Sequence, residues 1–265
     1  MPRLKLTLEY EGTRYVGWQV QPNGPSLQAA LEDALARLLG ERVSVSSAGR
    51  TDAGVHATGQ VACFDTTRVL PMKAYTMGLN GMLPEDLAVV DAVEVVEAFD
   101  PRRWSMGKRY RYRLSNRRTR SPLRRTTHWE VFAPLDVDAM RRAAAHLVGR
   151  HDYSAFRASD CQAKHAVREV RSLQVEGEAG DAVAFVVEGT AFLKHMVRNL
   201  VGTLVEVGKG RRPEAWVAEV LASRDRKRAG PTAPPQGLVL EQVFYGDGPP
   251  PRTPGGAPDA DEDEG

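Results

Sequence analysis

The chain has 265 residues, of which 42% are hydrophobic and 26% are charged, as in a folded globular protein of one large or two modest domains. No apolar run reaches the length of a membrane span, and the first residues alternate in polarity instead of forming the apolar core of a signal peptide. The two cysteines, Cys63 and Cys161, lie far apart, which excludes a disulfide framework and is typical of a reducing compartment. We therefore expect a cytoplasmic protein with no membrane part.

The small total charge of +2 conceals an asymmetry along the chain. Residues 247–265 contain six acidic residues and one arginine, a net charge of −5, so residues 1–246 carry about +7. The acidic end is rich in Pro and Gly, and we expect residues 247–265 to be a disordered tail. The basic remainder suits an anionic partner such as nucleic acid, although a charge of this size also serves solubility alone.

The first 100 residues are predicted to contain mostly strands with two helices. Residues 3–10 alternate between apolar and polar side chains, which predicts a half-buried strand of an antiparallel sheet. Ser26 is a suitable N-cap for a helix whose apolar residues recur at helical spacing until Gly40 ends it. Further strands are predicted at residues 43–46, 60–64 and 87–96, and a further helix at 74–79.

Between the strands at 43–46 and 60–64 lies the sequence Ala48-Gly-Arg-Thr-Asp-Ala-Gly-Val-His56. Two glycines flank Arg50, Thr51 and Asp52, and glycine allows a positive φ or a close approach to a ligand. A loop held between two strands is a good position for a single reactive carboxylate, so Asp52 is our candidate catalytic group. The alternative is an ordinary turn in which the aspartate bonds its own backbone.

Residues 101–129 form the strongest electrostatic feature, because they contain eleven Lys or Arg and no acidic residue. Within this stretch, residues 108–114 alternate and predict a strand with Tyr110, Tyr112 and Leu114 on one face and three arginines on the other. Aromatic rings can stack on an unpaired base while arginines hold phosphates, so these uncompensated cations favour RNA contact. The alternative is a strand with core tyrosines and a solvated arginine face.

The remaining chain is predicted to contain helices and strands in a similar mixture. A helix follows Asp136 and ends at Gly149, a hairpin joins strands at 170–175 and 182–188, and another helix covers 192–202. Pro213 suits the first turn of a further helix, and residues 238–245 form a last strand. The order predicts an α+β fold of two halves, residues 1–100 and 101–246, with largely antiparallel sheets flanked by helices.

One face of the predicted helix at 192–202 is unusual. Lys194, Arg198 and Gly202 are spaced by four residues, apart from the apolar residues of the same helix. A cation on an otherwise buried helix is costly unless a carboxylate or phosphate pairs with it.

Five segments together resemble the tRNA pseudouridine synthase A family, in the same order and over nearly all of residues 3–245. They are Tyr15–Gln19, Ala48–His56 with Gly59–Val61, Lys108–Tyr112, Phe156–Ala158 and His195–Gly202. The resemblance implies a homodimer of two similar α/β halves with an RNA cleft between them. It implies isomerisation of uridine to pseudouridine in the anticodon stem-loop of tRNA (family positions 38, 39 and 40), with no cofactor and no metal. The acidic tail has no counterpart in the family pattern.

The resemblance also assigns roles to four residues. Asp52 corresponds to the catalytic aspartate, and Arg198 to its basic partner, since a nearby cation favours the charged form of a carboxylate. Arg50 corresponds to the arginine that helps displace the target base, and Tyr110 to the tyrosine that stacks on the uracil. An ionised Asp52 could attack C1′ or C6, or stabilise charge while removing a proton from the ribose.

Two other functions compete with this interpretation. A non-catalytic module that binds and remodels tRNA would also need the basic stretch, with Asp52 as a turn residue. A metal-dependent hydrolase is less well supported, because His56, His151, His165 and His195 and the two cysteines show no recognised ligand spacing.

Overall fold

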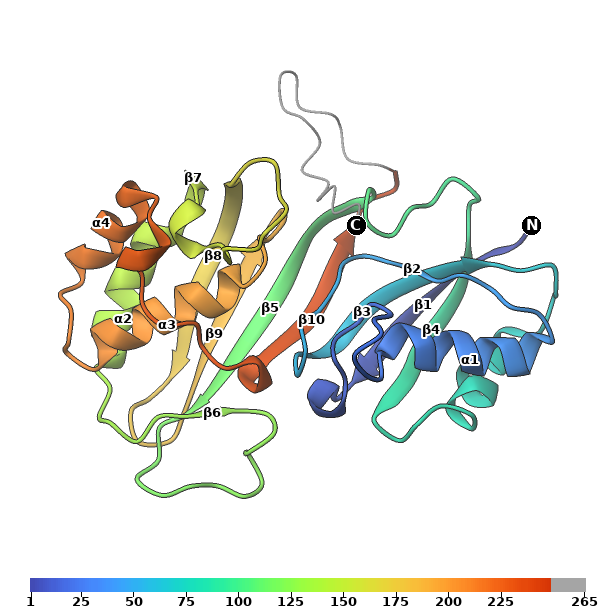
Figure 1. Cartoon of the computed structure of the whole chain (residues 1–265), viewed down its shortest axis with the longest axis horizontal. Helices are drawn as coiled ribbons and strands as arrows, with labels where there is room; N and C mark the ends of the chain where they lie inside the picture. Colours follow the sequence, from blue (N-terminus) through green and yellow to red (C-terminus); the bar gives the residue numbers. More distant parts are fainter. Residues whose placement is uncertain (249–265) are drawn as a thin grey trace. The chain divides into compact units, whose positions relative to one another are not determined.

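The computed structural model describes residues 1–248, which form two compact units (Figure 1). The first unit comprises residues 1–106 and 239–248, and the second comprises residues 107–238. Most of the acidic tail predicted at 247–265 lies outside the described residues. No helix of the described part is long and apolar enough to cross a membrane.

The first unit is built on a sheet in the order β4-β1-β3-β10, with β2 paired to β3. Its strands are β1 (Arg3–Tyr10), β2 (Ser46–Ser47), β3 (His56–Asp65), β4 (Leu87–Val95) and β10 (Leu238–Tyr245). β1 pairs in antiparallel fashion with both β3 and β4, as its alternating sequence predicts. β10 runs parallel to β3, with Val239 opposite His56, so the last strand joins the first unit, whereas the sequence placed it with the second half.

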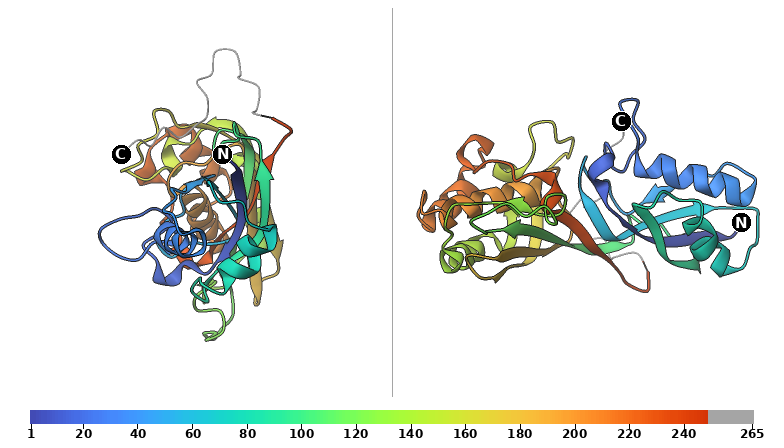
Figure 2. Two further views of the ribbon diagram at one scale, coloured as in Figure 1. Left: turned by 90° about the vertical axis from the view of Figure 1, so that its right-hand side faces the viewer. Right: turned by 90° about the horizontal axis from the view of Figure 1, so that it is seen from below.

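Helix α1 (Leu27–Leu39) lies against one face of this sheet (Figures 1 and 2). Its predicted ends are confirmed: the Ser26 side chain accepts a hydrogen bond from the Ala29 N–H at 3.2 Å, and Gly40 adopts a φ of 71°. The helix predicted at 74–79 is also present, but its middle turn, Ala74–Gly78, is a π-helix.

The strand predicted at 43–46 is wrong for its first three residues, because β2 begins only at Ser46. Side chains of α1 take the place of a strand partner there. The Val45 N–H donates to Glu32 Oε1 at 2.9 Å, and the Val45 carbonyl accepts from Gln28 Nε2 at 3.3 Å. Because both backbone groups of Val45 are already hydrogen-bonded, this residue needs no partner strand.

The second unit contains a sheet in the order β5-β9-β8-β7. Its strands are β5 (Ser105–Ser115), β6 (Trp129–Glu130), β7 (Gly149–Asp152), β8 (Val167–Gly177) and β9 (Ala182–Gly189). Neighbouring strands in this order are antiparallel, and β6 pairs with the end of β5 in parallel. The predicted hairpin is confirmed as β8 and β9.

Helices α2 (Val137–Ala144), α3 (Met196–Gly208) and α4 (Ala215–Ser223) lie together on one side of this sheet (Figures 1 and 2). Asp136 caps α2 by accepting the Ala139 N–H at 2.8 Å, as predicted. α3 starts four residues later than expected, because His195 adopts a left-handed backbone with a φ of 62°. The expected mixed α/β class with largely antiparallel sheets is confirmed.

We expect the free energy of unfolding to fall as the pH rises above about 10, where tyrosines of an unfolded chain ionise. Burial raises the pKa of six tyrosines above the ordinary 10.0, that of Tyr15 to about 12. These are Tyr10, Tyr15, Tyr75, Tyr112, Tyr153 and Tyr245. The folded state keeps their protons longer than the unfolded state, so the stability they supply is present below pH 10 and is lost above it.

Urea unfolding between about pH 8 and pH 11 measures this loss, which reaches at most about 1.4 kcal/mol per pH unit for each tyrosine. Tyr245→Phe should make the fall in the free energy of unfolding per pH unit smaller, by the contribution of one tyrosine. A stability that stays constant up to pH 11 would contradict the expectation.

Candidate active site

The loop that carries Asp52 is held against the segment that follows β1. The Trp18 N–H donates to the Thr51 carbonyl at 3.0 Å, and Gly17 forms an isolated β-bridge with Asp52. Gly17 has a φ of 116°, and a Cβ there would lie 2.6 Å from the Thr51 carbonyl oxygen. Only glycine permits this approach, which explains why Gly17 is needed beside the loop.

Two side chains of the protein core, those of Tyr10 and Gln60, also hold the loop that carries Asp52. The Tyr10 hydroxyl lies 2.8 Å from Thr51 Oγ1, and the amide Nε2 of Gln60 donates to the Gly49 carbonyl at 2.8 Å. Gln60 is fully buried and Thr51 is only 6% exposed, whereas Arg50 is exposed and Asp52 is half-buried. Because side chains alternate along an extended backbone, holding Thr51 inward presents Arg50 and Asp52 on the other side.

After Asp52 the chain turns sharply into β3. The Val55 N–H donates back to the Asp52 carbonyl at 3.1 Å, and Gly54 has a φ of 75°. The buried His56 then accepts the Gly12 N–H at its Nδ1, 2.9 Å away, which places the ring proton on Nε2. His56 is thus bonded as a structural residue. Among residues 1–248 no group of three His, Cys, Asp or Glu is arranged to hold a metal ion.

Tyr110 lies in β5 of the second unit, on the face covered by that unit's helices. It is 9% exposed, and its ring meets Phe192 edge-on, with centroids 5.2 Å apart. The predicted alternation of β5 is confirmed, since Tyr112 and Leu114 are also buried and the intervening arginines are partly exposed. Tyrosines and arginines therefore occupy opposite faces of one strand, so the arginines of β5 extend from the face opposite the Tyr110 ring.

The expectation that the basic stretch is uncompensated is wrong for three of its arginines. Arg109 pairs with Glu188 of β9, Arg111 lies 2.6 Å from Glu176 of β8, and Arg124 lies 3.1 Å from Asp181. These carboxylates come from β9, from β8 and from the turn between them, far along the chain from the arginines, so local sequence does not reveal the pairing. A neutralised arginine adds little attraction for a polyanion.

Arg198 lies on α3, and the segment 230–234 packs along that helix. Arg198 Nε donates to the Ala233 carbonyl at 2.7 Å, while the Ala233 N–H donates to the Arg198 carbonyl at 3.1 Å. A Cβ on Gly202 would lie 1.7 Å from the Pro231 carbonyl oxygen. Lys194 pairs with Asp160 at 2.6 Å. Arg198 and Gly202 of the unusual face therefore contact the backbone of segment 230–234, whereas Lys194, which precedes α3, pairs with a carboxylate.

The sequence reasoning missed the residues that hold this segment. Asn199 is fully buried, its Nδ2 donates to the Phe156 carbonyl at 2.7 Å, and its Oδ1 accepts from Thr232 at 2.7 Å and from Arg226 at 3.0 Å. Burial lowers the pKa of Arg226. The run Gly-Pro-Thr-Ala-Pro-Pro at 230–235 was the available signal, because such a run cannot form a helix and needs external partners.

The four predicted site residues are thus distributed over both units. Arg50 and Asp52 share one loop of the first unit, and Tyr110 and Arg198 belong to the second. Each is positioned by buried neighbours, and each unit by itself supplies only part of the predicted site.

The sequence profile of a family described as tRNA pseudouridine synthase matches residues 7–102 and 143–246. Arg50, Asp52 and Arg198 lie inside the matched ranges, and Tyr110 lies between them. The tRNA pseudouridine synthase A of Myxococcus xanthus is 84% identical over all 265 residues of both chains. That of Geotalea uraniireducens is 50% identical over 92% of this chain and 100% of its own, and that of Pelobacter propionicus is 52% identical over the same shares.

These matches and the mixed α/β fold define an isomerase that acts on RNA, a pseudouridine synthase. The chain belongs to the tRNA pseudouridine synthase family. The activity expected from the resemblance, isomerisation of uridine to pseudouridine in tRNA, is confirmed.

We expect Gly202→Ala to lower the stability by about 3 kcal/mol or more and to reduce activity, because the new methyl group meets the Pro231 backbone and displaces the segment that holds Arg198. Gly78→Ala is the control, since its Cβ would make ordinary contacts at 3.6 Å in a helical segment and should be neutral or slightly stabilising. Thermal unfolding and turnover of both variants measure the difference. A Gly202→Ala protein with wild-type stability would contradict the described packing.

Proposed function

We propose that the chain isomerises uridine in the anticodon stem-loop of tRNA, with Asp52 as the essential catalytic group. The observation that carries the role of Asp52 is the way its loop is held. Trp18, Tyr10 and Gln60 bond Thr51 and Gly49, the residues just before a half-buried carboxylate. The relatives named tRNA pseudouridine synthase A, which match over 92% or more of this chain, support the substrate.

The reaction breaks the N1–C1′ bond, turns the uracil and joins C5 to C1′. These atoms are inaccessible in a stacked and paired helix, so the base must leave the stack at a cost of a few kcal/mol. Arg50, exposed on the same loop as Asp52, fills the space that the base vacates. Tyr110 stacks on the extruded uracil, and the edge contact with Phe192 keeps its ring in one orientation.

Arg198 serves as the cationic partner that keeps Asp52 charged. Its Nε hydrogen bond to Ala233 and the buried network around Asn199 orient the guanidinium group. In this proposal the predicted halves, residues 1–100 and 101–246, contribute different groups to one reaction.

We also propose that the enzyme is a homodimer in the cytoplasm, as the family resemblance implies. Sedimentation equilibrium of the purified chain tests the dimer, since a monomer at assay concentration would refute it. Cell fractionation tests the location.

Asp52→Asn should bind unmodified tRNA as tightly as wild type and show no turnover, because the amide can neither attack the sugar or base nor take a proton. Tritium release from a transcript that carries 5-tritiated uridine reports the new bond at C5. Asp91→Asn, an exposed aspartate of β4, is the matched control and should keep wild-type release.

Release by Asp52→Asn at near the wild-type rate would refute Asp52 as the essential group. Release by neither Asp52→Asn nor the wild type, with tRNA still bound, would favour the non-catalytic module.

Tyr110→Phe should keep most of the activity, because stacking requires the ring and not the hydroxyl. Tyr112→Phe is its structural counterpart: the buried Tyr112 hydroxyl donates to the Pro234 carbonyl at 2.8 Å, so this variant should lose about 1–3 kcal/mol of stability and keep its activity when folded. Single-turnover rates and urea unfolding separate the two effects. Collapse of the rate in Tyr110→Phe would assign the hydroxyl a chemical task.

A further inference from the structure

The basic stretch divides into two parts with different surroundings. Its β5 arginines include the two that pair with Glu188 of β9 and Glu176 of β8. The chain then forms a loop between β5 and β6, residues 117–128, which we call the arginine loop. It extends away from the sheet of the second unit near the β6 label in Figure 1.

Most cations of the arginine loop have no carboxylate partner. Arg117, Arg118, Arg120 and Arg125 are exposed, and none forms an ion pair with any residue of 1–248. Arg124 alone pairs with a carboxylate, Asp181. The loop contains no acidic residue, so it presents four positive charges on a short exposed segment.

The ends of the arginine loop are held by buried hydrogen bonds. Asn116 is 5% exposed, and its Nδ2 donates to the carbonyls of Val131 and Ala133 at 2.7 and 2.8 Å. Its Oδ1 accepts the Gly180 N–H at 3.1 Å. The Val131 N–H donates to the Ser115 carbonyl at 2.9 Å, next to the β5–β6 pairing.

Hydrogen bonds within the loop continue this order. The Arg124 carbonyl accepts the N–H groups of Thr127 and His128 at 3.1 and 2.9 Å, and the Ser121 N–H donates to Glu130. A segment that is already ordered loses little conformational entropy when its charges bind a ligand.

The distance from Tyr110 limits which part of a substrate the loop can meet. Both belong to the second unit, and five residues of β5 separate Tyr110 from Ser115, about 17 Å at about 3.3 Å per residue. Arg117 lies two residues further. A stacked strand advances about 3.4 Å per nucleotide, so the distance of about 17 Å to Ser115 corresponds to about five nucleotides.

We propose that the arginine loop binds backbone phosphates of tRNA about five or more nucleotides from the target uridine. The inference rests on the proposed function, because Tyr110 marks the position of the target base. Contacts remote from the reacting atoms stabilise the bound substrate and the transition state equally, so they strengthen binding and leave the saturated rate unchanged.

The first test replaces Arg117, Arg118 and Arg120 by alanine together. The Kd for unmodified tRNA should rise about tenfold at about 0.1 M salt, and the slope of log Kd against log salt should fall by about two to three units. The single-turnover rate at saturating enzyme should stay at the wild-type value. Replacing the same three residues by lysine should restore the slope, since phosphate attraction depends on charge.

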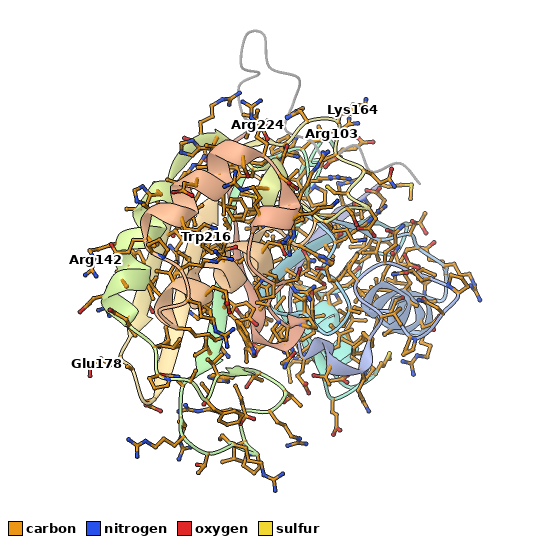
Figure 3. The ribbon with its side chains drawn as sticks, turned by 60° about the vertical axis from the view of Figure 1, so that its left-hand side comes forward. Arg103, Arg142, Lys164, Glu178, Trp216 and Arg224 are labelled. Atoms are coloured by element: carbon orange, nitrogen blue, oxygen red, sulfur yellow. The ribbon has the colours of Figure 1, made fainter. Side chains whose placement is uncertain are left out.

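A charge-matched control separates the loop from general attraction. Arg142, Arg211 and Arg228 are exposed arginines of the second unit that pair with carboxylates, and Arg142 projects from α2 in Figure 3. Their triple alanine variant has the same net charge as the loop variant and should change the slope by less than about one unit. Equal weakening in both triple variants, or a wild-type slope in the loop variant, overturns the proposal.

Position is tested by cross-linking. Leu123 is 93% exposed at the loop, so a photoreactive residue there should fold normally and mark the nearest nucleotides. Cross-links five or more nucleotides from the target support the proposal, and cross-links confined to its immediate neighbours overturn it. A wild type that binds tRNA but releases no tritium would refute the proposed function. The slope of log Kd against log salt tests the arginine loop separately, because it is a binding measurement that does not depend on turnover.

Discussion

The hydrogen bonds that hold Thr51 determine how the first unit presents its chemistry. The Thr51 carbonyl accepts from the Trp18 N–H, and its hydroxyl meets that of the buried Tyr10. Because the residue between Arg50 and Asp52 is fixed inward, the two charged side chains are displayed outward without being buried. The arrangement needs Gly17 at the contact and Gln60 under Gly49. In its proposed catalytic role the Asp52 carboxylate has to keep one position, and the core of the unit supplies that rigidity.

In the second unit, a charged side chain is held by a backbone segment. A guanidinium group on an otherwise buried helix requires acceptors, and the irregular segment 230–234 supplies a backbone carbonyl to Arg198. That segment is held by Asn199, Thr203 and Gly202 on the same helix, through side-chain hydrogen bonds and a close backbone contact. Helix α3 therefore provides Arg198, and neighbouring residues of the same helix bind the segment 230–234 that orients the Arg198 side chain.

Local sequence patterns predicted most of the helices and strands. They did not predict the hydrogen bonds and ion pairs between residues far apart in the chain. The alternation of residues 3–10 and the Ser26 and Gly40 caps predicted β1 and α1 because the responsible forces act between near neighbours. The failure at residues 43–45 arose because Glu32 and Gln28 of α1 bond that backbone, and the charge balance of β5 depends on Glu188 and Glu176. Of the predicted site, the position of each residue on its element followed from sequence. The supports that hold it, such as Tyr10 under Thr51 or Ala233 on Arg198, are tertiary contacts without a local pattern.

The parallel pairing of β10 with β3 has a consequence for the order in which the chain folds. The first unit lacks its last strand until residues 239–245 have been made, whereas residues 107–238 form a continuous segment. At about 5–20 residues per second, ribosomes need about 7 to 26 seconds to synthesise that segment. During this interval the start of β3, at His56 and Ala57 next to the loop that holds Asp52, lacks its β10 partner, while β2 pairs only with Ala62 and Cys63. The unit that carries Asp52 is therefore completed only after the whole second unit has been synthesised.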